Sequence, residues 1–123
     1  MLAVGTDILE IARIEQVLER QGERFARRIL TDAELQEYRA SGQPARLLAR
    51  RFAAKEAVAK ALGTGIGRGV SWQDILIAHD PAGAPLVQLS GGAHDVLQAR
   101  GARSVLISLS DERHYTVAFA ALV

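Results

Sequence analysis

The sequence predicts an α+β domain in which a largely antiparallel sheet packs against one long helix and several shorter helices. Two observations predict this fold class. After a short strand, the first half of the chain carries apolar residues at helical spacing, whereas the second half carries two pairs of short β-rich segments. No linker, composition shift or internal repeat divides the 123 residues, so we expect a single domain over residues 1–123.

The chain is expected to begin with a short strand at residues 2–4, which Gly5 ends. A first helix follows and is expected to stop at Gly22. Its apolar residues recur at helical spacing: Ile11, Ile14, Val17 and Leu18.

Two more helices are expected before the middle of the chain. Thr31 and Glu34 have the spacing of a capping box, which predicts a short helix ending near residues 41–42. Pro44 suits the first turn of a longer helix, and Gly63 is its natural C-terminal cap. One side of this longer helix is apolar and small: Ala54, Ala57, Val58 and Ala61.

The second half is expected to form two hairpins on either side of one helix. The segments are strands at 74–78 and 85–89 joined by a turn at 80–83, a helix at 92–100 closed by Gly101, and strands at 104–109 and 115–122. The apolar residues of the last hairpin are interpreted as core: Val105, Ile107, Val117 and Phe119.

Composition excludes several classes of protein. Hydrophobic residues make up 49% of the chain and charged residues 24%, which is typical of a folded domain. The chain has no cysteine, so disulfides, zinc–thiolate sites and a thiol nucleophile are excluded. No apolar run approaches the roughly 20 residues of a membrane span, and no leader pattern is present, so we expect a cytoplasmic protein without a membrane partner.

Positive charge gathers on one segment. Residues 39–60 hold six basic side chains and one acidic one, a local net charge of +5, although the net charge of the whole chain is +1. This concentration suits an anionic ligand or partner. A solvated helix face is the alternative.

Asp7 and Glu56 are the candidate metal ligands. Asp7 lies among apolar residues, where an unpaired carboxylate is costly, and its alternative role is the N-cap of the helix that follows. Two carboxylates, completed by substrate phosphate and water, are the usual minimum for Mg²⁺.

Two lysines bracket Glu56. Glu56 and Lys60 are four residues apart and share a helix face. An ordinary surface ion pair between them is the alternative to a binding site. Lys55 lies about 100° around the helix axis from Glu56. Of the adjacent residues Lys55 and Glu56, one is therefore expected to reach a metal while the other meets a different part of the same ligand.

The glycine-rich loop at residues 63–69 invites a nucleotide-binding interpretation but fails the test for a P-loop. A P-loop lysine follows the glycines and opens a helix, whereas Lys60 precedes them and closes one. Cations near the end of the helix, with the flexible backbone of Gly63 and Gly65, are still suited to a diphosphate. A glycine-rich helix stop is also a common structural device.

A strip of arginines begins on the first helix and extends beyond Gly22: Arg13, Arg20, Arg24, Arg27 and Arg28. Interleaved glutamates make an ordinary mixed surface the alternative to a binding face. A basic module that binds nucleic acid or an acidic protein is the rival function. Few aromatic residues lie among the basic ones, which argues against nucleic acid as a partner.

Two motifs together resemble the signatures of the 4′-phosphopantetheinyl transferases. They are Gly5-Thr6-Asp7 with Arg13 six residues later, and the run Arg51-Phe52-Ala53-Ala54-Lys55-Glu56-Ala57-Val58-Ala59-Lys60. The length, the Gly-Thr-Gly-Ile loop and the Glu-Arg-His-Tyr segment are similar to its small, single-repeat branch, the holo-[acyl-carrier-protein] synthases. The resemblance covers essentially the whole chain.

The resemblance implies transfer of the phosphopantetheine arm of coenzyme A to a serine of apo acyl carrier protein, releasing adenosine 3′,5′-bisphosphate and serving fatty acid biosynthesis. It implies that Asp7 and Glu56 bind Mg²⁺, that Lys60 contacts phosphate, and that a homotrimer places its sites between subunits. The general base stays open between Glu56 and a metal-bound water.

Other residues are assigned from the same resemblance. Predicted contacts to coenzyme A are Arg51, Lys55, Lys60, Gly63, Gly65 and Pro85, and predicted contacts to the acidic carrier protein are Arg13, Arg20 and Arg24. The chain departs from the family in two places. Asp111 stands where some relatives have a histidine, and Gly83-Ala84-Pro85 where many have Gly-Lys-Pro. The participation of Asp111 or His114 is left open.

Overall fold

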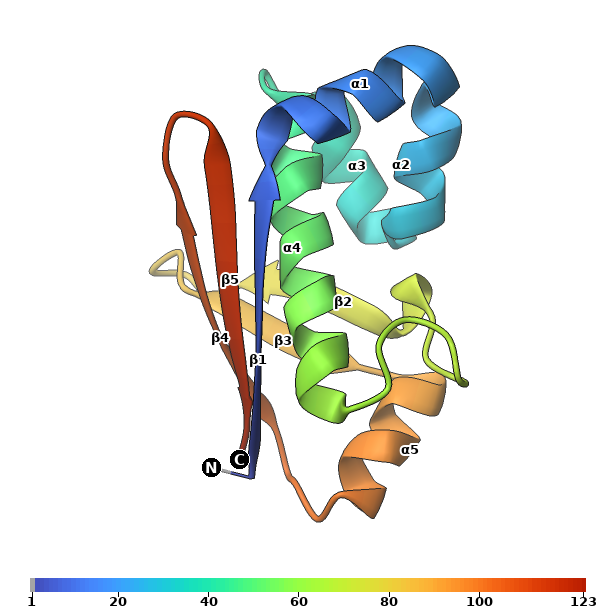
Figure 1. Ribbon diagram of the computed structural model, residues 1–123, viewed down its shortest axis with the longest axis vertical. Helices are drawn as coiled ribbons and strands as arrows, with labels where there is room; N and C mark the ends of the chain where they lie inside the picture. The colour runs from blue at the N-terminus through green and yellow to red at the C-terminus, as the bar shows by residue number, and fades with distance from the viewer. Residues whose placement is uncertain (1) are drawn as a thin grey trace.

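The longest helix, α4 (Pro44–Leu62), runs through the middle of the molecule in the computed structural model, which describes residues 2–123 (Figure 1). The other helices are α1 (Ile11–Gln21), α2 (Glu23–Ile29), α3 (Asp32–Ala40) and α5 (Gly91–Ala99), with a 3₁₀ turn at Trp72–Asp74. The strands are β1 (Ala3–Glu10), β2 (Ile75–His79), β3 (Pro85–Leu89), β4 (Val105–Asp111) and β5 (Tyr115–Leu122).

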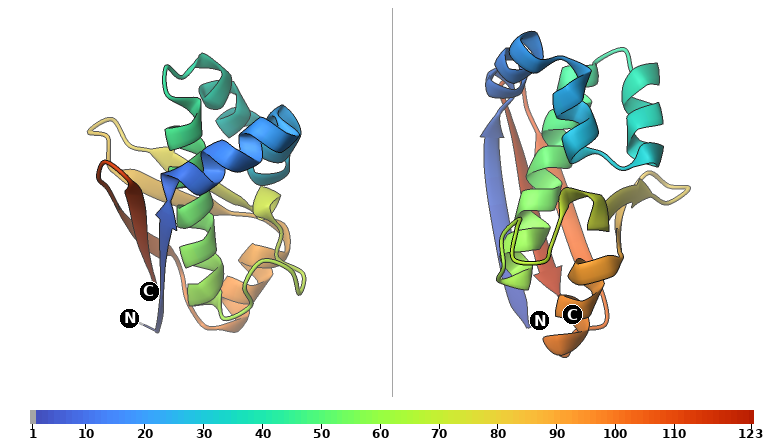
Figure 2. Two further views of the ribbon diagram at one scale, coloured as in Figure 1. Left: turned by 45° about the horizontal axis from the view of Figure 1, so that its top comes forward. Right: turned by 90° about the vertical axis from the view of Figure 1, so that its right-hand side faces the viewer.

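The strands form two antiparallel sheets. One has three strands in the order β1-β5-β4, and the other is the hairpin of β2 and β3. Helix α4 packs against β1 and β5 on one side, while α1 to α3 lie on its other side (Figure 2). The predicted α+β class, both hairpins and the long helix are confirmed. The division into two sheets was not predicted.

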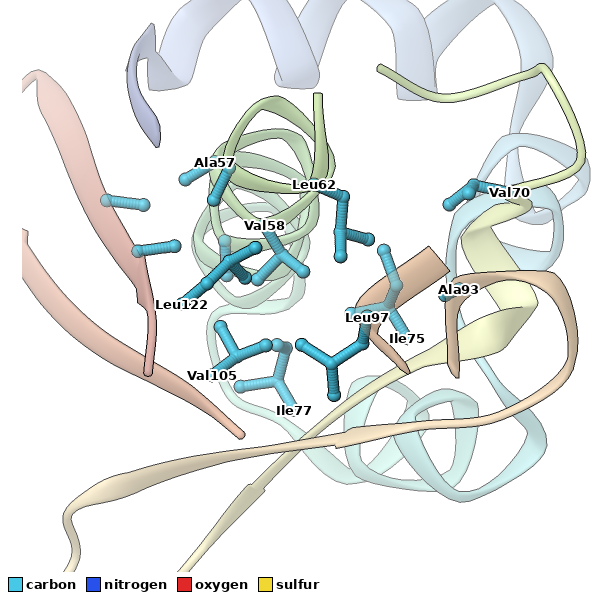
Figure 3. Packing of buried hydrophobic residues seen from close by; sticks show 14 of the residues in the cluster. Ala57, Val58, Leu62, Val70, Ile75, Ile77, Ala93, Leu97, Val105 and Leu122 are labelled. Carbon is cyan, nitrogen blue, oxygen red and sulfur yellow. The ribbon is translucent and has the colours of Figure 1, made fainter. Parts of the chain in front are cut away.

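Small side chains let α4 lie close to the three-stranded sheet. Ala53, Ala57 and Ala61 are wholly or almost wholly buried, and the inward-facing Ala118 and Ala120 of β5 are buried too. Larger apolar side chains fill the space between α4, β2 and α5, among them Val58, Ile77 and Leu97, as Figure 3 shows. Closely packed alanines leave little room for a gap between helix and sheet.

The ends of the helices follow the predicted signals. Pro44 occupies the first turn of α4, and Gly63 caps its C-terminus at φ +86°. The capping box of α3 is present in full: Thr31 N donates to Glu34 Oε1 at 2.8 Å, and Glu34 N donates to Thr31 Oγ1 at 3.3 Å. Helix α2 was not predicted, because its seven residues are too few for a clear apolar period.

The prediction that Gly5 ends the first strand is wrong. Strand β1 continues through Gly5 to Glu10, and each of its residues pairs with β5, from Ala3 opposite Leu122 to Glu10 opposite Tyr115. A glycine weakens an isolated strand, but here a full ladder of partners supports it.

The core assignment of Val117 and Phe119 is also wrong. Both are on the outward side of β5 and are 39% and 40% exposed, because the alternate residues of that strand face α4. Val105 is buried, and Ile107 packs against the core as predicted. We call the outward apolar residues of this sheet the outer sheet face: Val4, Ile8, Leu106, Tyr115, Val117 and Phe119.

Candidate active site

Asp7 lies in the middle of β1, on the side of the sheet that faces α4. Its side chain is 16% exposed, and its backbone pairs with Ala118 of β5. Helix α1 begins four residues later, and Glu10 precedes it without a side-chain cap. The alternative role of Asp7 as a helix N-cap is therefore wrong.

Lys60 of α4 reaches across to this strand. Its Nζ donates to Asp7 Oδ1 at 3.1 Å and to the carbonyl oxygen of Thr6 at 2.9 Å. The alternative, an ordinary surface ion pair with Glu56, is absent among the ion pairs of residues 2–123. The side chain of Lys60 is 50% exposed, so its amine can contact a ligand while it is hydrogen-bonded to β1.

Glu56 lies one turn before Lys60 and close enough to Asp7 for their charges to interact. Burial raises the pKa of Glu56, the charge of Asp7 raises it further, and Lys60 lowers it. Burial and a neighbouring like charge both disfavour the ionised form of a carboxyl group, and a nearby cation favours it. The arrangement is one in which a bound cation would be favourable.

The oxygen ligands at this point are two carboxylates. Within residues 2–123, no group of three or more His, Cys, Asp or Glu side chains is arranged so that it could hold a metal ion. Two hard oxygen donors suit Mg²⁺, which keeps waters and substrate phosphates as its other ligands. They do not suit a structural metal, which the protein alone must enclose.

Lys55, whose contact with coenzyme A stays a prediction, lies in the interior of the protein. Its side chain is completely buried, and its Nζ donates to Glu34 Oε1 at 2.6 Å, to Ile29 O at 2.8 Å and to Trp72 O at 3.1 Å. Burial lowers the pKa of Lys55, and Glu34 opposes that shift. The rotation of about 100° from Glu56 turns Lys55 away from β1 and into the body of the protein.

Glu34 bonds to three separate elements, and the sequence predicted only one of these contacts. Besides capping α3 and pairing with Lys55, its Oε2 accepts from Ile77 N of β2 at 2.8 Å. The capping-box pattern indicated the local bond. No sequence signal indicated the two distant partners, which tie α3, α4 and β2 together.

Arg51 lies one turn before Lys55 and is also enclosed. Its side chain is 4% exposed and its Nη2 is 3.5 Å from Glu37 Oε2. Its Nε has no hydrogen-bond partner within the part of the chain that the structure describes. A contact between Arg51 and coenzyme A remains a prediction.

The glycine loop folds back on the end of α4. Gly63 N donates to Lys60 O at 3.0 Å, and Gly65 N donates to Ala59 O at 3.1 Å. The loop therefore lies against the backbone of Ala59 and Lys60 and presents no helix N-terminus to a phosphate. Pro85 begins β3, in the two-stranded sheet rather than beside Asp7.

The predicted partner contacts lie on α1 and α2. Arg13 and Arg20 of α1 and Arg24 of α2 are exposed, and none forms an ion pair with another residue of the 2–123 range. Gly22 separates the two helices at φ +62°, so the three side chains do not share one continuous helix.

The two positions left open lie at the other end of α4. Asp111 accepts from Arg46 and Arg50 at 3.2 and 3.5 Å, so its charge is met by two cations. His114 helps to line a cleft of about 370 Å³ between the starts of α1 and α4 and the β4–β5 turn. Neither Asp7 nor Glu56 lines this cleft.

Comparison with known proteins identifies the family of the chain. The chain matches the 4′-phosphopantetheinyl transferase superfamily over residues 3–120. The chain therefore belongs to that superfamily, as its two motifs predicted. In the residues that the structure describes, no helix is both long and apolar enough to cross a membrane.

The relatives define the group within the superfamily. A holo-[acyl-carrier-protein] synthase from Shewanella amazonensis is 57% identical over 99% of this chain and 98% of its own length. The crystal structure of the synthase from Neisseria meningitidis covers the whole chain and 98% of its own at 41% identity, with a TM-score of 0.94. The chain belongs with the holo-[acyl-carrier-protein] synthases, which are transferases.

Several solved relatives carry a ligand. The synthase from Helicobacter pylori, 32% identical over 98% of this chain and 99% of its own, was crystallised in complex with coenzyme A and has a TM-score of 0.85.

Proposed function

We propose that this enzyme transfers the 4′-phosphopantetheine arm of coenzyme A to a serine of apo acyl carrier protein, with Mg²⁺, and releases adenosine 3′,5′-bisphosphate. The observation that carries the proposal is the meeting of Asp7, Glu56 and Lys60 at the β1–α4 contact. The names of the relatives and the coenzyme A complex of one of them support the substrate and the acceptor.

Asp7 and Glu56 are the residues that would hold Mg²⁺. A bound Mg²⁺ would neutralise the diphosphate of coenzyme A and the charge that develops on its leaving oxygen. Lys60 adds a second cation on the same side, and its exposed amine suits a contact with phosphate. The backbone of Gly63 and Gly65 and the start of β3 at Pro85 complete the proposed surface for coenzyme A.

The transfer reaction requires few further groups from the protein. The serine oxygen forms a bond to the phosphorus that carries the pantetheine, the bond from that phosphorus to the bridging oxygen breaks, and the serine proton must leave. Glu56 is a candidate base because burial raises its pKa, which makes its carboxylate a stronger proton acceptor; a metal-bound water is the other candidate. Most of the acceleration then comes from position and charge.

The acyl carrier protein is proposed to bind at α1 and α2. Arg13, Arg20 and Arg24 are exposed and form no ion pair within residues 2–123, so an acidic protein surface would complement them. If reversing the charge of Arg20 left the KM for carrier protein unchanged, this assignment would fail. We place the reaction in the cytoplasm, where it would serve fatty acid biosynthesis.

A homotrimer is proposed as the working assembly. The outer sheet face presents a row of large apolar side chains, with Ile8 opposite Val117 on neighbouring strands. An exposed apolar face of this kind marks an interaction surface, and copies of the same chain can cover it by symmetry.

One incubation tests the proposal. The protein is mixed with coenzyme A, Mg²⁺ and apo acyl carrier protein, and the carrier is analysed by mass spectrometry. A gain of the phosphopantetheine mass on one serine is expected, and chelation of the metal should prevent it. Salt-sensitive binding to nucleic acid without any affinity for coenzyme A would instead support the rival basic module.

A further inference from the structure

Gly5 occupies the tightest contact between β1 and α4. A Cβ added at this residue would overlap the carbonyl oxygen of Ala57 and would lie 2.5 Å from Ala61 N and 2.9 Å from Lys60 Cβ. The first two atoms are helix backbone, which cannot turn aside as a side chain can. Either the strand or the helix would have to move by about 1 Å to restore an ordinary contact distance.

Space, rather than backbone conformation, explains the glycine. Gly5 is not among the residues with positive φ, and it pairs with Ala120 as an ordinary member of the ladder. Any L-residue could adopt its backbone angles. A glycine is needed at this point only because α4 lies so close.

The contact is next to the proposed metal site on both elements. On β1, Gly5 and Asp7 are two residues apart and therefore lie on the same side of the strand. On α4, the atoms that Gly5 meets belong to Ala57, which follows Glu56, to Lys60 itself and to Ala61. A shift at Gly5 would reach all three site residues through at most two bonded neighbours.

We propose that Gly5 is a positioning residue: the absence of a side chain brings β1 close enough to α4 for Asp7 to face Glu56 and Lys60. The inference rests on the proposed function, since it assigns a purpose to the distance between the carboxylates. The close approach of the two elements also explains why Lys60 on α4 can reach both Thr6 O and Asp7 Oδ1 on β1.

Gly5→Ala is the direct test. The Kd for Mn²⁺, a spectroscopic substitute for Mg²⁺, is measured by electron paramagnetic resonance, and kcat and the KM for coenzyme A are measured with Mg²⁺. We expect at least a tenfold weaker Mn²⁺ affinity, and a kcat lowered by about 100-fold, the usual cost of a misplacement near 1 Å. A folded Gly5→Ala protein with unchanged Mn²⁺ affinity would overturn the inference.

Gly92→Ala is the matched control for loss of stability. A Cβ at Gly92 would overlap the carbonyl oxygen of Gly69, again a backbone atom, and Gly92 also has no positive φ, but it belongs to α5. This variant should lower the melting temperature and keep the wild-type Mn²⁺ affinity. Equal loss of Mn²⁺ affinity in both variants would mean a general effect of destabilisation and would overturn the inference.

Two further variants complete the design. If Gly5→Ala does not fold, Ala120→Val adds bulk on the neighbouring strand at the same level, and it should weaken Mn²⁺ binding in the same direction; unchanged affinity would overturn the inference. Asp7→Asn separates the two hypotheses. If that variant binds Mn²⁺ as well as the wild type, the proposed metal pair fails and the role of Gly5 fails with it.

Discussion

Lys60 Nζ on α4 lies 3.1 Å from Asp7 Oδ1 on β1, across a contact between two elements that are more than fifty residues apart in the chain. The same amine holds the carbonyl of Thr6 at 2.9 Å. This pair joins the two elements that carry the proposed active site. The lysine therefore links α4 to β1 at this point.

Lys60→Ala is expected to weaken binding of coenzyme A. Loss of a charged hydrogen bond to phosphate costs about 1.5–3 kcal/mol, which corresponds to roughly a 10- to 150-fold rise in Kd. Isothermal titration calorimetry measures the change. Arg103→Ala, which removes an exposed cation elsewhere, should leave the Kd unchanged. Equal affinity in Lys60→Ala and the wild type would remove the phosphate role of Lys60.

Asp7→Asn is expected to lower the transfer rate by about three orders of magnitude, because a charged metal ligand worth several kcal/mol is lost. The rate of holo-carrier formation measures the effect, and circular dichroism checks the fold. Asp95→Asn changes an exposed carboxylate on α5 and should keep full activity. A fully active Asp7→Asn enzyme is the result that the metal-pair hypothesis could not survive. Glu56→Ala should fail in the same assay.

Glu56→Gln is expected to inactivate the enzyme and yet to stabilise the metal-free protein at neutral pH. The folded pKa of Glu56 is raised above its ordinary value of 4.5, chiefly by burial. As pH rises from 4.5 through that folded pKa, the unfolded chain loses the proton first, and the folded state loses stability. The melting temperature of the variant in EDTA should therefore exceed that of the wild type at pH 7, and the two should converge below pH 4.5. A higher wild-type melting temperature at pH 7 would contradict the burial of this carboxyl.

Lys55→Met is expected to destabilise the protein by about 3–5 kcal/mol, because it leaves Glu34 as an uncompensated buried charge. Urea denaturation measures the free energy of unfolding. The double variant Lys55→Met with Glu34→Gln should recover part of the loss, since the remaining amide carries no charge. A loss below about 1 kcal/mol in the single variant would show that the pair contributes little.

Val117→Glu is expected to dissociate the proposed trimer, because it places a charge on the outer sheet face. Analytical ultracentrifugation reports the mass in solution. Leu86→Glu makes the same kind of change at an exposed leucine of the other sheet and should not alter the assembly. A wild-type protein that sediments as a monomer would reject the trimer outright.

Local sequence signals determined much of the fold. Pro44 and Gly63 predicted both ends of α4, and the Thr31–Glu34 spacing predicted the start of α3. Turn residues at 80–83 predicted one hairpin, and β-forming residues predicted the other. Each of these signals acts through neighbours in the chain, so the sequence alone carries it. Two motifs, recognised together, also predicted the family.

The tertiary structure decided what depends on distant partners. It carried β1 through Gly5, because β5 pairs with every residue of that strand, and it turned Val117 and Phe119 outward. In the folded protein Lys55 pairs with Glu34 in the interior and Lys60 pairs with Asp7, although the two lysines flank the same glutamate. Helix rotation and the close approach of β1 to α4 separate the two roles, and neither can be obtained from the order of residues within one segment.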